Sequence, residues 1–381
     1  MAKPREYGMS SMKLARTTLL AATASASLFA ADAASAGAKF SIDDTHWVSV
    51  GAGLRTSFSS VEDAAPDNGR SNDFTVDSIR LYLNAQIHQY ILLEFNTERY
   101  DTGDDDDIRV LDAIAKFTVA PEFNIWAGRH LPPSDRANLD GPYYLNAWTF
   151  PIAQAYPAIF AGRDEGVSVN GSINEGVFGY AFGIYDGMDA SYAGIDSMNN
   201  PNQDDNLLFA GRLQWALWDP EPGFYTTSSY FGEKNILTFG VAAQYQSDGT
   251  GTMASPGDFF GWNIDALLEK KVGDGGAFSL EGAYYDYDHD DEMPAFGYQG
   301  NGYYVLASFL TPQKFGIGKL QPHVRYQAVD DDNAPDHDRW ELGLGYIIDG
   351  QKAKVIATYG ADDYDGGETT DFFILGVQLQ I

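Results

Sequence analysis

The sequence predicts an all-β fold, an antiparallel transmembrane β-barrel of about sixteen strands. Three observations predict it: segments in which apolar and polar residues alternate, an export signal at the N-terminus, and an alternating segment that ends the chain. The alternation is clearest in Val76–His88, where every second residue from Ile79 to Ile87 is apolar and the residues between them are polar. Because strand side chains point alternately to two faces, one face of this segment suits lipid and the other suits water. Its thirteen residues also match a tilted membrane-spanning strand.

Residues 1–36 have the pattern of a signal peptide. Basic residues come first, a stretch of apolar and small residues follows at 17–30, and Ala34-Ser35-Ala36 predicts cleavage before Gly37. A membrane anchor is disfavoured, because this stretch is short and rich in alanine. No run of about 18 apolar residues follows Gly37, so we expect residues 37–381 to form the barrel and to cross the membrane with strands. An exported barrel is expected in the outer membrane of a Gram-negative bacterium.

The alternating segments number sixteen, and an even number suits a closed antiparallel barrel. Short turns and long acidic loops alternate between them, which assigns the turns to the periplasmic rim and the loops to the extracellular rim. Residues 218–234 are the exception, since this connection is long but falls on the periplasmic side, and the pattern offers no account of it beyond a turn with strand extensions. The expected strands are 46–58, 74–88, 90–100, 108–119, 123–130, 166–173, 177–186, 206–217, 235–247, 259–271, 277–288, 302–311, 320–329, 338–348, 352–361 and 371–381.

Charged residues recur on the polar faces of these strands. A charge at the bilayer midplane costs about 2–4 kcal/mol on the lipid side, so these side chains are expected to face a wet interior. About sixteen strands enclose an aqueous channel, whereas about eight are filled by side chains. The strand phase predicts seven residues of the pore wall: Arg80, Glu94, Glu98, Lys116, Arg212, Glu269 and Arg325.

The longest connection, His130–Glu165, follows the fifth strand and differs from the other loops. Five prolines stiffen it, and several aromatic residues are available to pack against the wall, so we expect it to fold into the lumen. Rings of charged side chains set ion preference at such narrowings. The alternative is a loop folded over the mouth, with its charges paired structurally. The candidate constriction residues are Arg129, Asp135, Arg136, Asp140, Arg163, Asp164 and Glu165.

The last predicted strand alternates and stops at the chain terminus. Its segment Phe373–Ile381 resembles the C-terminal signal that the barrel-assembly machinery reads, with Gly376, Leu379 and Ile381 at the key positions. The usual last residue of that signal is Phe, and Ile381 departs from it while staying apolar. The assembly machinery is therefore an expected partner.

Seven segments carry a wider resemblance: Ser78–Asn84, Ile91–Glu98, Asn124–Arg129, Leu131–Pro142, Phe160–Gly166, Trp218–Pro222 and Ala266–Lys271. Together they resemble the bacterial porins, specifically the phosphate-selective porin O/P type and its proteobacterial relatives. The likeness spans essentially the whole mature chain, and it implies a sixteen-stranded barrel, a homotrimer and the passive passage of small solutes. Phosphate selectivity is not carried over, because it rests on a ladder of pore arginines and a lysine cluster. This chain has 24 Lys and Arg residues without such a concentration.

The composition excludes several classes of function. The net charge is −30, and it becomes −32 when residues 1–36, with four cations and two acids, are removed. Such acidity disfavours nucleic acid as a partner and should enrich cations at the pore mouth. The chain has no cysteine, so disulfides, thiol chemistry and cysteine-type zinc sites are excluded. The acidic loops have no calcium-loop spacing, so solvated loops are favoured over divalent bridging to lipopolysaccharide, and no metal or cofactor is predicted.

The sequence therefore predicts a passive diffusion channel for ions and small hydrophilic solutes, leaning toward cations and surrounded by outer-membrane lipid and lipopolysaccharide. The alternative is a non-conducting structural or adhesive barrel, whose lumen would be filled. An enzyme is disfavoured, since the chain has six histidines and neither His88 nor His323 is brought near a serine by the strand pattern. A gated active transporter would need an N-terminal plug domain, and the first strand begins soon after the cleavage site.

Overall fold

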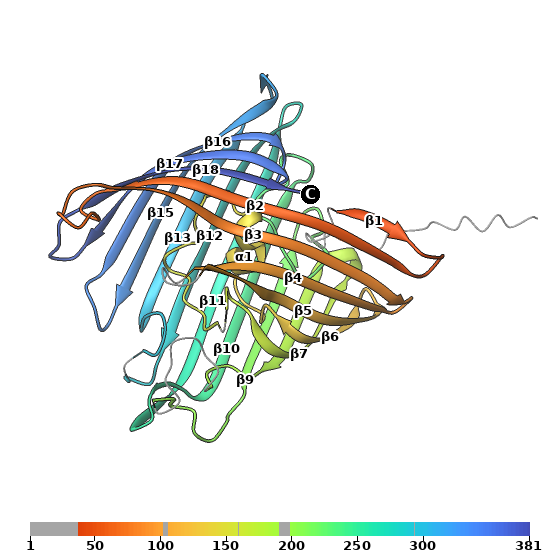
Figure 1. Cartoon of the computed structure of the whole chain (residues 1–381), viewed down its shortest axis with the longest axis horizontal. Coiled ribbons are helices and arrows are strands. Elements are labelled where there is room, and N and C mark those ends of the chain that lie inside the picture. The colour runs from red at the N-terminus through yellow and green to blue at the C-terminus, as the bar shows by residue number, and fades with distance from the viewer. Residues whose placement is uncertain (1–36, 102–105, 159, 190–198, 293) are drawn as a thin grey trace, which may run out of the picture.

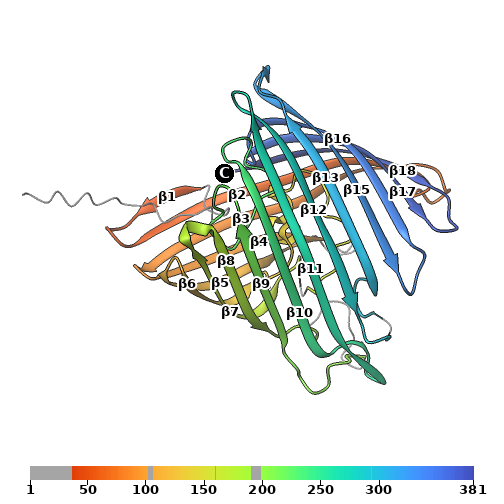
Figure 2. The ribbon, with the colours of Figure 1, turned by 180° about the vertical axis from the view of Figure 1, so that it is seen from behind.

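The sixteen predicted strands form a closed antiparallel barrel, which confirms the predicted fold class (Figures 1 and 2). The computed structural model describes residues 37–101, 106–158, 160–189, 199–292 and 294–381. Residues 1–36, assigned above to the signal peptide, lie outside the described residues. Each long strand pairs with its neighbours in the chain, and the last long strand pairs with the first to complete the ring.

The ring follows chain order from β2 to β18, with the short β14 outside it. Its strands are β2 (Trp47–Val61), β3 (Ser71–His88), β4 (Ile91–Asp101), β5 (Asp106–Ala120), β6 (Phe123–His130), β7 (Asp164–Ile173), β8 (Phe178–Tyr185), β9 (Leu208–Ala216), β10 (Ile236–Thr252), β11 (Ser255–Val272), β12 (Gly276–Asp288), β13 (Gly300–Leu310), β15 (Gly318–Asp331), β16 (His337–Asp349), β17 (Ala353–Tyr364) and β18 (Thr370–Gln380).

Short elements complete the fold, and the sequence pattern did not predict them. They are β1 (Ala38–Ser41), β14 (Lys314–Phe315), the helix α1 (Arg136–Tyr144) and the 3-10 turn η1 (Asn174–Gly176). Strand β1 pairs with the end of β2 that lies at the rim with short turns, which we call the periplasmic rim. Among the described residues, no helix combines the length and the apolar character that crossing a bilayer requires.

The largest departure from the predicted strand ends is at β10 and β11. The sequence predicted a loop at 247–258, but the two strands run on to Thr252 and from Ser255. The Asp258 carboxylate accepts hydrogen bonds from the Ser247 hydroxyl and the Asp248 backbone N–H. The sequence predicted a solvated loop here, but these residues stabilise a hairpin that extends the barrel wall.

The two faces of the wall differ as the alternation predicted. On β3, Leu81 is 46% exposed on the outside, whereas its neighbours Arg80 and Tyr82 are buried on the lumenal side. Aromatic side chains such as Trp215 and Tyr303 are exposed on the outer face. Such residues anchor a barrel at the two membrane–water interfaces.

The chain terminus helps to close the ring. Ile381 donates its backbone N–H to the Ala52 carbonyl at 2.8 Å and accepts from the Ala52 N–H at 3.0 Å. The last residue therefore continues the pairing of β18 with β2, and β1 pairs with the next residues of β2 toward the periplasmic rim.

Two connections lie inside the ring. Residues 131–163, which we call the inserted loop, join β6 to β7 and contain α1 (Figure 1). Residues 217–235, which we call the periplasmic insert, join β9 to β10 and enter from the opposite rim. The long turn at 218–234 that the sequence left unexplained is this second insert.

Apolar clusters join the inserts to the wall. One packs Ala137, Leu145 and Tyr156 of the inserted loop against wall residues that include Phe259 and Tyr285. A second packs Leu131 and Leu139 against Trp126 of β6 and Phe224 of the periplasmic insert. The core of this protein is therefore in the barrel lumen, between the wall and the two inserts.

Candidate pore constriction

Among the described residues, six ion pairs line the lumen, and both members of each pair are buried. Strand alternation places their wall members on the lumenal face, and in five pairs the separation of the charged atoms is 2.5 to 2.9 Å. A charge removed from water is stable only when it is paired. These pairs include most of the buried charged residues of the wall. They are Arg80–Glu98, Lys116–Glu94, Arg136–Glu221, Arg163–Asp112, Arg212–Asp265 and Arg325–Glu341.

The helix α1 is fixed at its N-terminus by polar contacts with the wall. Asp135 caps it by accepting from the Asn138 backbone N–H at 3.2 Å. The same carboxylate oxygen accepts from the Tyr285 hydroxyl of β12 at 2.8 Å. The Arg136 backbone N–H donates to Asp265 of β11 at 3.2 Å. These contacts fix the start of the helix at the β11–β12 side of the lumen.

Arg136 connects the two inserts. Its guanidinium donates to both carboxylate oxygens of Glu221, at 2.6 and 3.1 Å, and to the Thr227 carbonyl at 3.0 Å. The Tyr230 hydroxyl donates to the same Glu221 at 2.6 Å. A bidentate pair of this kind fixes orientation as well as distance. The inserted loop and the periplasmic insert are thus joined by a buried ion pair within the pore.

Glu269 of β11 holds the far end of the periplasmic insert. It accepts from the backbone N–H groups of Tyr230 and Gly232, at 2.9 and 2.8 Å, and from the Ser229 hydroxyl at 2.9 Å. A turn in the lumen has no ladder partner, so a wall carboxylate satisfies its backbone donors. Glu269 was predicted as a pore-wall residue, and its position in the structure is that of an anchor for the insert.

On the opposite side, glycines admit aromatic side chains of the inserted loop. A Cβ added at Gly376 of β18 would lie 2.5 Å from the Trp148 ring, and one added at Gly53 of β2 would lie 2.8 Å from the Tyr143 hydroxyl oxygen. Arg55 of β2 stacks over the Trp148 ring at 3.9 Å and donates to the Trp148 carbonyl at 2.6 Å. The loop therefore spans the lumen from β11 and β12 to β2 and β18.

The seven predicted wall residues all lie on the lumenal face and are buried. Of the seven predicted constriction residues, five are buried in or beside the lumen. Asp135, Arg136 and Asp140 belong to the inserted loop, Arg163 pairs with Asp112 of β5, and Asp164 accepts from the Glu165 and Gly187 backbone N–H groups.

The structure corrects the placement of the other two, Arg129 and Glu165. They pair with each other at 3.0 Å on the outward face, level with the exposed Ala113 of β5. Their side chains are 27% and 50% exposed. The adjacent residues His130 and Asp164 face the lumen instead. The prediction was therefore wrong by one residue on each strand.

Sequence reasoning did not select several lumenal charges. The alternation that identified the predicted wall residues could have identified five more, because they lie on the same polar strand faces: Asp112, Asp265, Glu281, Glu341 and Lys354. Glu221 had no such signal, because it lies in a turn that folds inward. Among the described residues, eight cationic and eleven acidic side chains are buried, so the lumen has an acidic excess. No group of three or more His, Asp or Glu residues among them could hold a metal ion.

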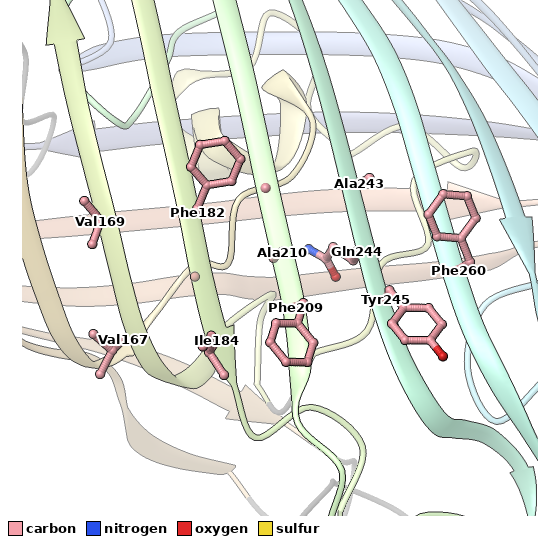
Figure 3. A pocket seen from close by; sticks show the side chains of 12 residues that line it. Val167, Val169, Phe182, Ile184, Phe209, Ala210, Ala243, Gln244, Tyr245 and Phe260 are labelled. Carbon is pink, nitrogen blue, oxygen red and sulfur yellow. The ribbon is translucent and has the colours of Figure 1, made fainter.

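The structure has one large hollow on the outer face of the wall and one small cavity in the lumen. A hollow of about 580 Å³ lies on the wall over β7 to β11, lined by apolar side chains that include Phe182, Phe209 and Phe260 (Figure 3). On its outer face, Gly211 pairs with Ala243, and these small residues leave space between the aromatic rings. A smaller cavity of about 40 Å³ lies in the lumen beside Arg80 and Asp140. The large hollow therefore belongs to the apolar outer surface.

Solved structures of outer-membrane proteins resemble this fold. The channel DcaP of Acinetobacter baumannii is 12% identical, with a TM-score of 0.58 over 90% of this chain and 100% of that one. The anion-selective porin of Comamonas acidovorans is 13% identical, with a TM-score of 0.57 over 88% and 100%. OmpT of Vibrio cholerae is 14% identical, with a TM-score of 0.57 over 90% and 100%.

The sequence comparisons give no family. No family model matches the chain, and no curated protein does either. At this level of identity the structural likeness shows the fold, a closed sixteen-stranded barrel of the kind that outer-membrane porins have.

Proposed function

We propose that this protein is an outer-membrane channel through which ions and small hydrophilic solutes diffuse passively. The observation that carries this proposal is the polar lumen: eight cationic and eleven acidic side chains of the described residues are buried inside a ring whose outer face is apolar. A lumen filled for stability alone would bury apolar residues, because an apolar contact of similar volume stabilises as well as a buried ion pair. Charged groups along the lumen are the groups that an ion path requires.

The two inserts determine what kind of channel this is. They cross the lumen from opposite rims and meet at the Arg136–Glu221 pair. The passage is therefore narrow, and the unit conductance should be small for a sixteen-stranded barrel. Asp135, Arg136, Asp140, Arg163 and Asp164 are the proposed constriction residues. The acidic excess of the lumen favours cations.

Several expectations from the sequence belong to this proposal. Residues 1–36 direct export, the barrel resides in the outer membrane among lipid and lipopolysaccharide, and the C-terminal strand is read by the assembly machinery. The resemblance to the phosphate-selective porin O/P type supports a homotrimer, whereas phosphate preference is not proposed, because the 24 Lys and Arg residues show no such concentration as that preference needs. DcaP is named an outer membrane channel and the Comamonas protein an anion-selective porin, which supports the channel. We propose no catalytic reaction for this barrel.

Single-channel recording of refolded residues 37–381 in planar bilayers, under a KCl gradient, tests the proposal. We expect discrete conductance steps with a reversal potential that favours cations. Steps that favour anions would keep the channel and reject the cation preference. The second candidate is a non-conducting structural barrel, which the extent of lumenal filling by the two inserts favours. Absence of steps from protein shown to be folded by circular dichroism would reject the channel in favour of that barrel.

A further inference from the structure

Three elements meet in the lumen around two acidic side chains. Asp140 lies on α1, Glu281 on β12 and Ser228 on the periplasmic insert. The Ser228 hydroxyl donates to Asp140 Oδ2 at 2.7 Å and also interacts with Glu281. The Tyr304 hydroxyl donates to Glu281 Oε1 at 2.7 Å. A hydroxyl has one proton, so Ser228 cannot satisfy both carboxylates.

One oxygen of each carboxylate is left over. Asp140 Oδ1 and Glu281 Oε2 are buried and have no hydrogen-bond partner among the described residues. The two side chains are 4% and 3% exposed. A buried carboxylate oxygen without a donor or a cation is strongly unfavourable, so two of them around one serine hydroxyl call for a shared proton or a positively charged ligand.

The nearby cationic side chains are engaged elsewhere. Arg136, one helical turn before Asp140, directs its guanidinium to Glu221 and the Thr227 carbonyl. Lys354 donates its three protons to neutral oxygens: the Tyr143 and Leu145 carbonyls and Gln351 Oε1. No described cationic side chain comes within ion-pair distance of Asp140 or Glu281. Asp140 and Glu281 are therefore among the buried acids that have no cationic partner among the described residues.

The donor set indicates the class of cation. Carboxylate and hydroxyl oxygens are hard ligands and exclude soft metals. Two carboxylates and a hydroxyl supply few of the six to eight oxygens that calcium takes, whereas a monovalent cation that passes through a channel needs only weak coordination, which lets it leave again. We propose that Asp140, Glu281 and Ser228 form a binding subsite for a monovalent alkali cation inside the lumen. The role of this subsite in ion passage rests on the channel function proposed above, whereas binding itself does not.

Rubidium, an alkali cation with strong anomalous scattering, tests the subsite directly. Crystals of the mature protein are grown with RbCl as the monovalent salt. We expect an anomalous peak between the Asp140 and Glu281 carboxylates, and we expect it to be absent in Asp140→Asn. Asp332→Asn, in an exposed turn between β15 and β16, is the matched control and should keep the peak. A water alone at this position, or a peak that survives in Asp140→Asn, would overturn the proposal.

Solution binding gives a second readout. The wild-type protein should unfold at a higher temperature in RbCl than in choline chloride of equal ionic strength. In Asp140→Asn the Rb⁺ concentration for half of this effect should rise at least tenfold, and Ser228→Ala is the variant to use where Asp140→Asn does not fold. An equal response in wild type and variant rejects the subsite. A conducting protein without bound Rb⁺ rejects the subsite but keeps the channel, and bound Rb⁺ without conductance does the reverse.

Discussion

The two inserts occupy the same lumen but depend on apolar packing and on carboxylate contacts to different extents. The inserted loop adds extensive apolar burial to its polar contacts with the wall, since Ala137, Leu145 and Tyr156 pack in a cluster with aromatic wall residues. The periplasmic insert packs Phe224 in an apolar cluster as well, but its far end is held by hydrogen bonds to the carboxylates of Glu269 and Asp140. Apolar packing does not depend on the charge of nearby carboxyl groups, whereas a hydrogen bond to a carboxylate is strongest when that group is ionised. The difference indicates that the periplasmic insert is the more easily released of the two.

Removing the periplasmic insert is the largest test of this difference. Asp219 and Asn235 are still hydrogen-bonded as an extension of the β9–β10 pair. Replacing residues 220–234 by Asn-Gly should therefore leave a two-residue hairpin and an intact ring. We expect the unit conductance to rise more than for any point substitution, as single-channel recording would show.

The matched control shortens a connection outside the lumen. Residues 62–70 join β2 to β3, and Val61 pairs with Ser71, so the same Asn-Gly replacement is possible there. This control should leave the unit conductance unchanged. Equal conductance in both shortened proteins would show that the periplasmic insert does not limit the pore.

Glu221→Gln should have the next largest effect. It leaves Arg136 charged, buried and without its acidic partner, which costs about 3–5 kcal/mol when a buried pair is broken. Denaturant unfolding of the refolded protein would measure this loss. The lumen also loses one negative charge, so the reversal potential under a KCl gradient should move toward anions. A variant as stable as wild type would contradict the buried pair.

Tyr285→Phe tests the inserted loop at its N-terminus. The Tyr285 hydroxyl donates to Asp135 at 2.8 Å, while the ring packs in the apolar cluster. Loss of the hydroxyl alone should cost about 1 kcal/mol, because the ring keeps its packing. Conductance should stay close to wild type, since the apolar contacts hold the loop in place. A large rise in conductance would mean that the Tyr285–Asp135 contact, and not the apolar cluster, holds this loop in place.

The sequence predicted the wall well and the lumen only in part. Alternation is a local property, so it located sixteen strands and placed Arg80, Lys116 and Arg325 on the correct face. Whether a turn folds into the lumen depends on contacts with residues distant in the sequence. The pairing of Glu221 with Arg136 is such a contact, and no local pattern predicts it. The prediction also extended the constriction to Arg129 because it treated the residues next to the loop as part of the loop. Adjacent strand residues face opposite sides of the wall, so Arg129 points outward and the next residue, His130, points into the lumen.

Arg129→Gln should have the smallest effect, and Arg136→Gln is its matched partner. Arg129 pairs with Glu165 on the outer wall, where both are partly exposed, and exposed ion pairs contribute about 1 kcal/mol or less. We expect Arg129→Gln to leave the reversal potential unchanged and Arg136→Gln to move it toward cations, because only Arg136 lies in the ion path. Recording both variants in one KCl gradient measures the difference directly. Equal shifts from the two would place Arg129 in the pore and contradict the strand phase of β6, on which the assignment of both faces depends.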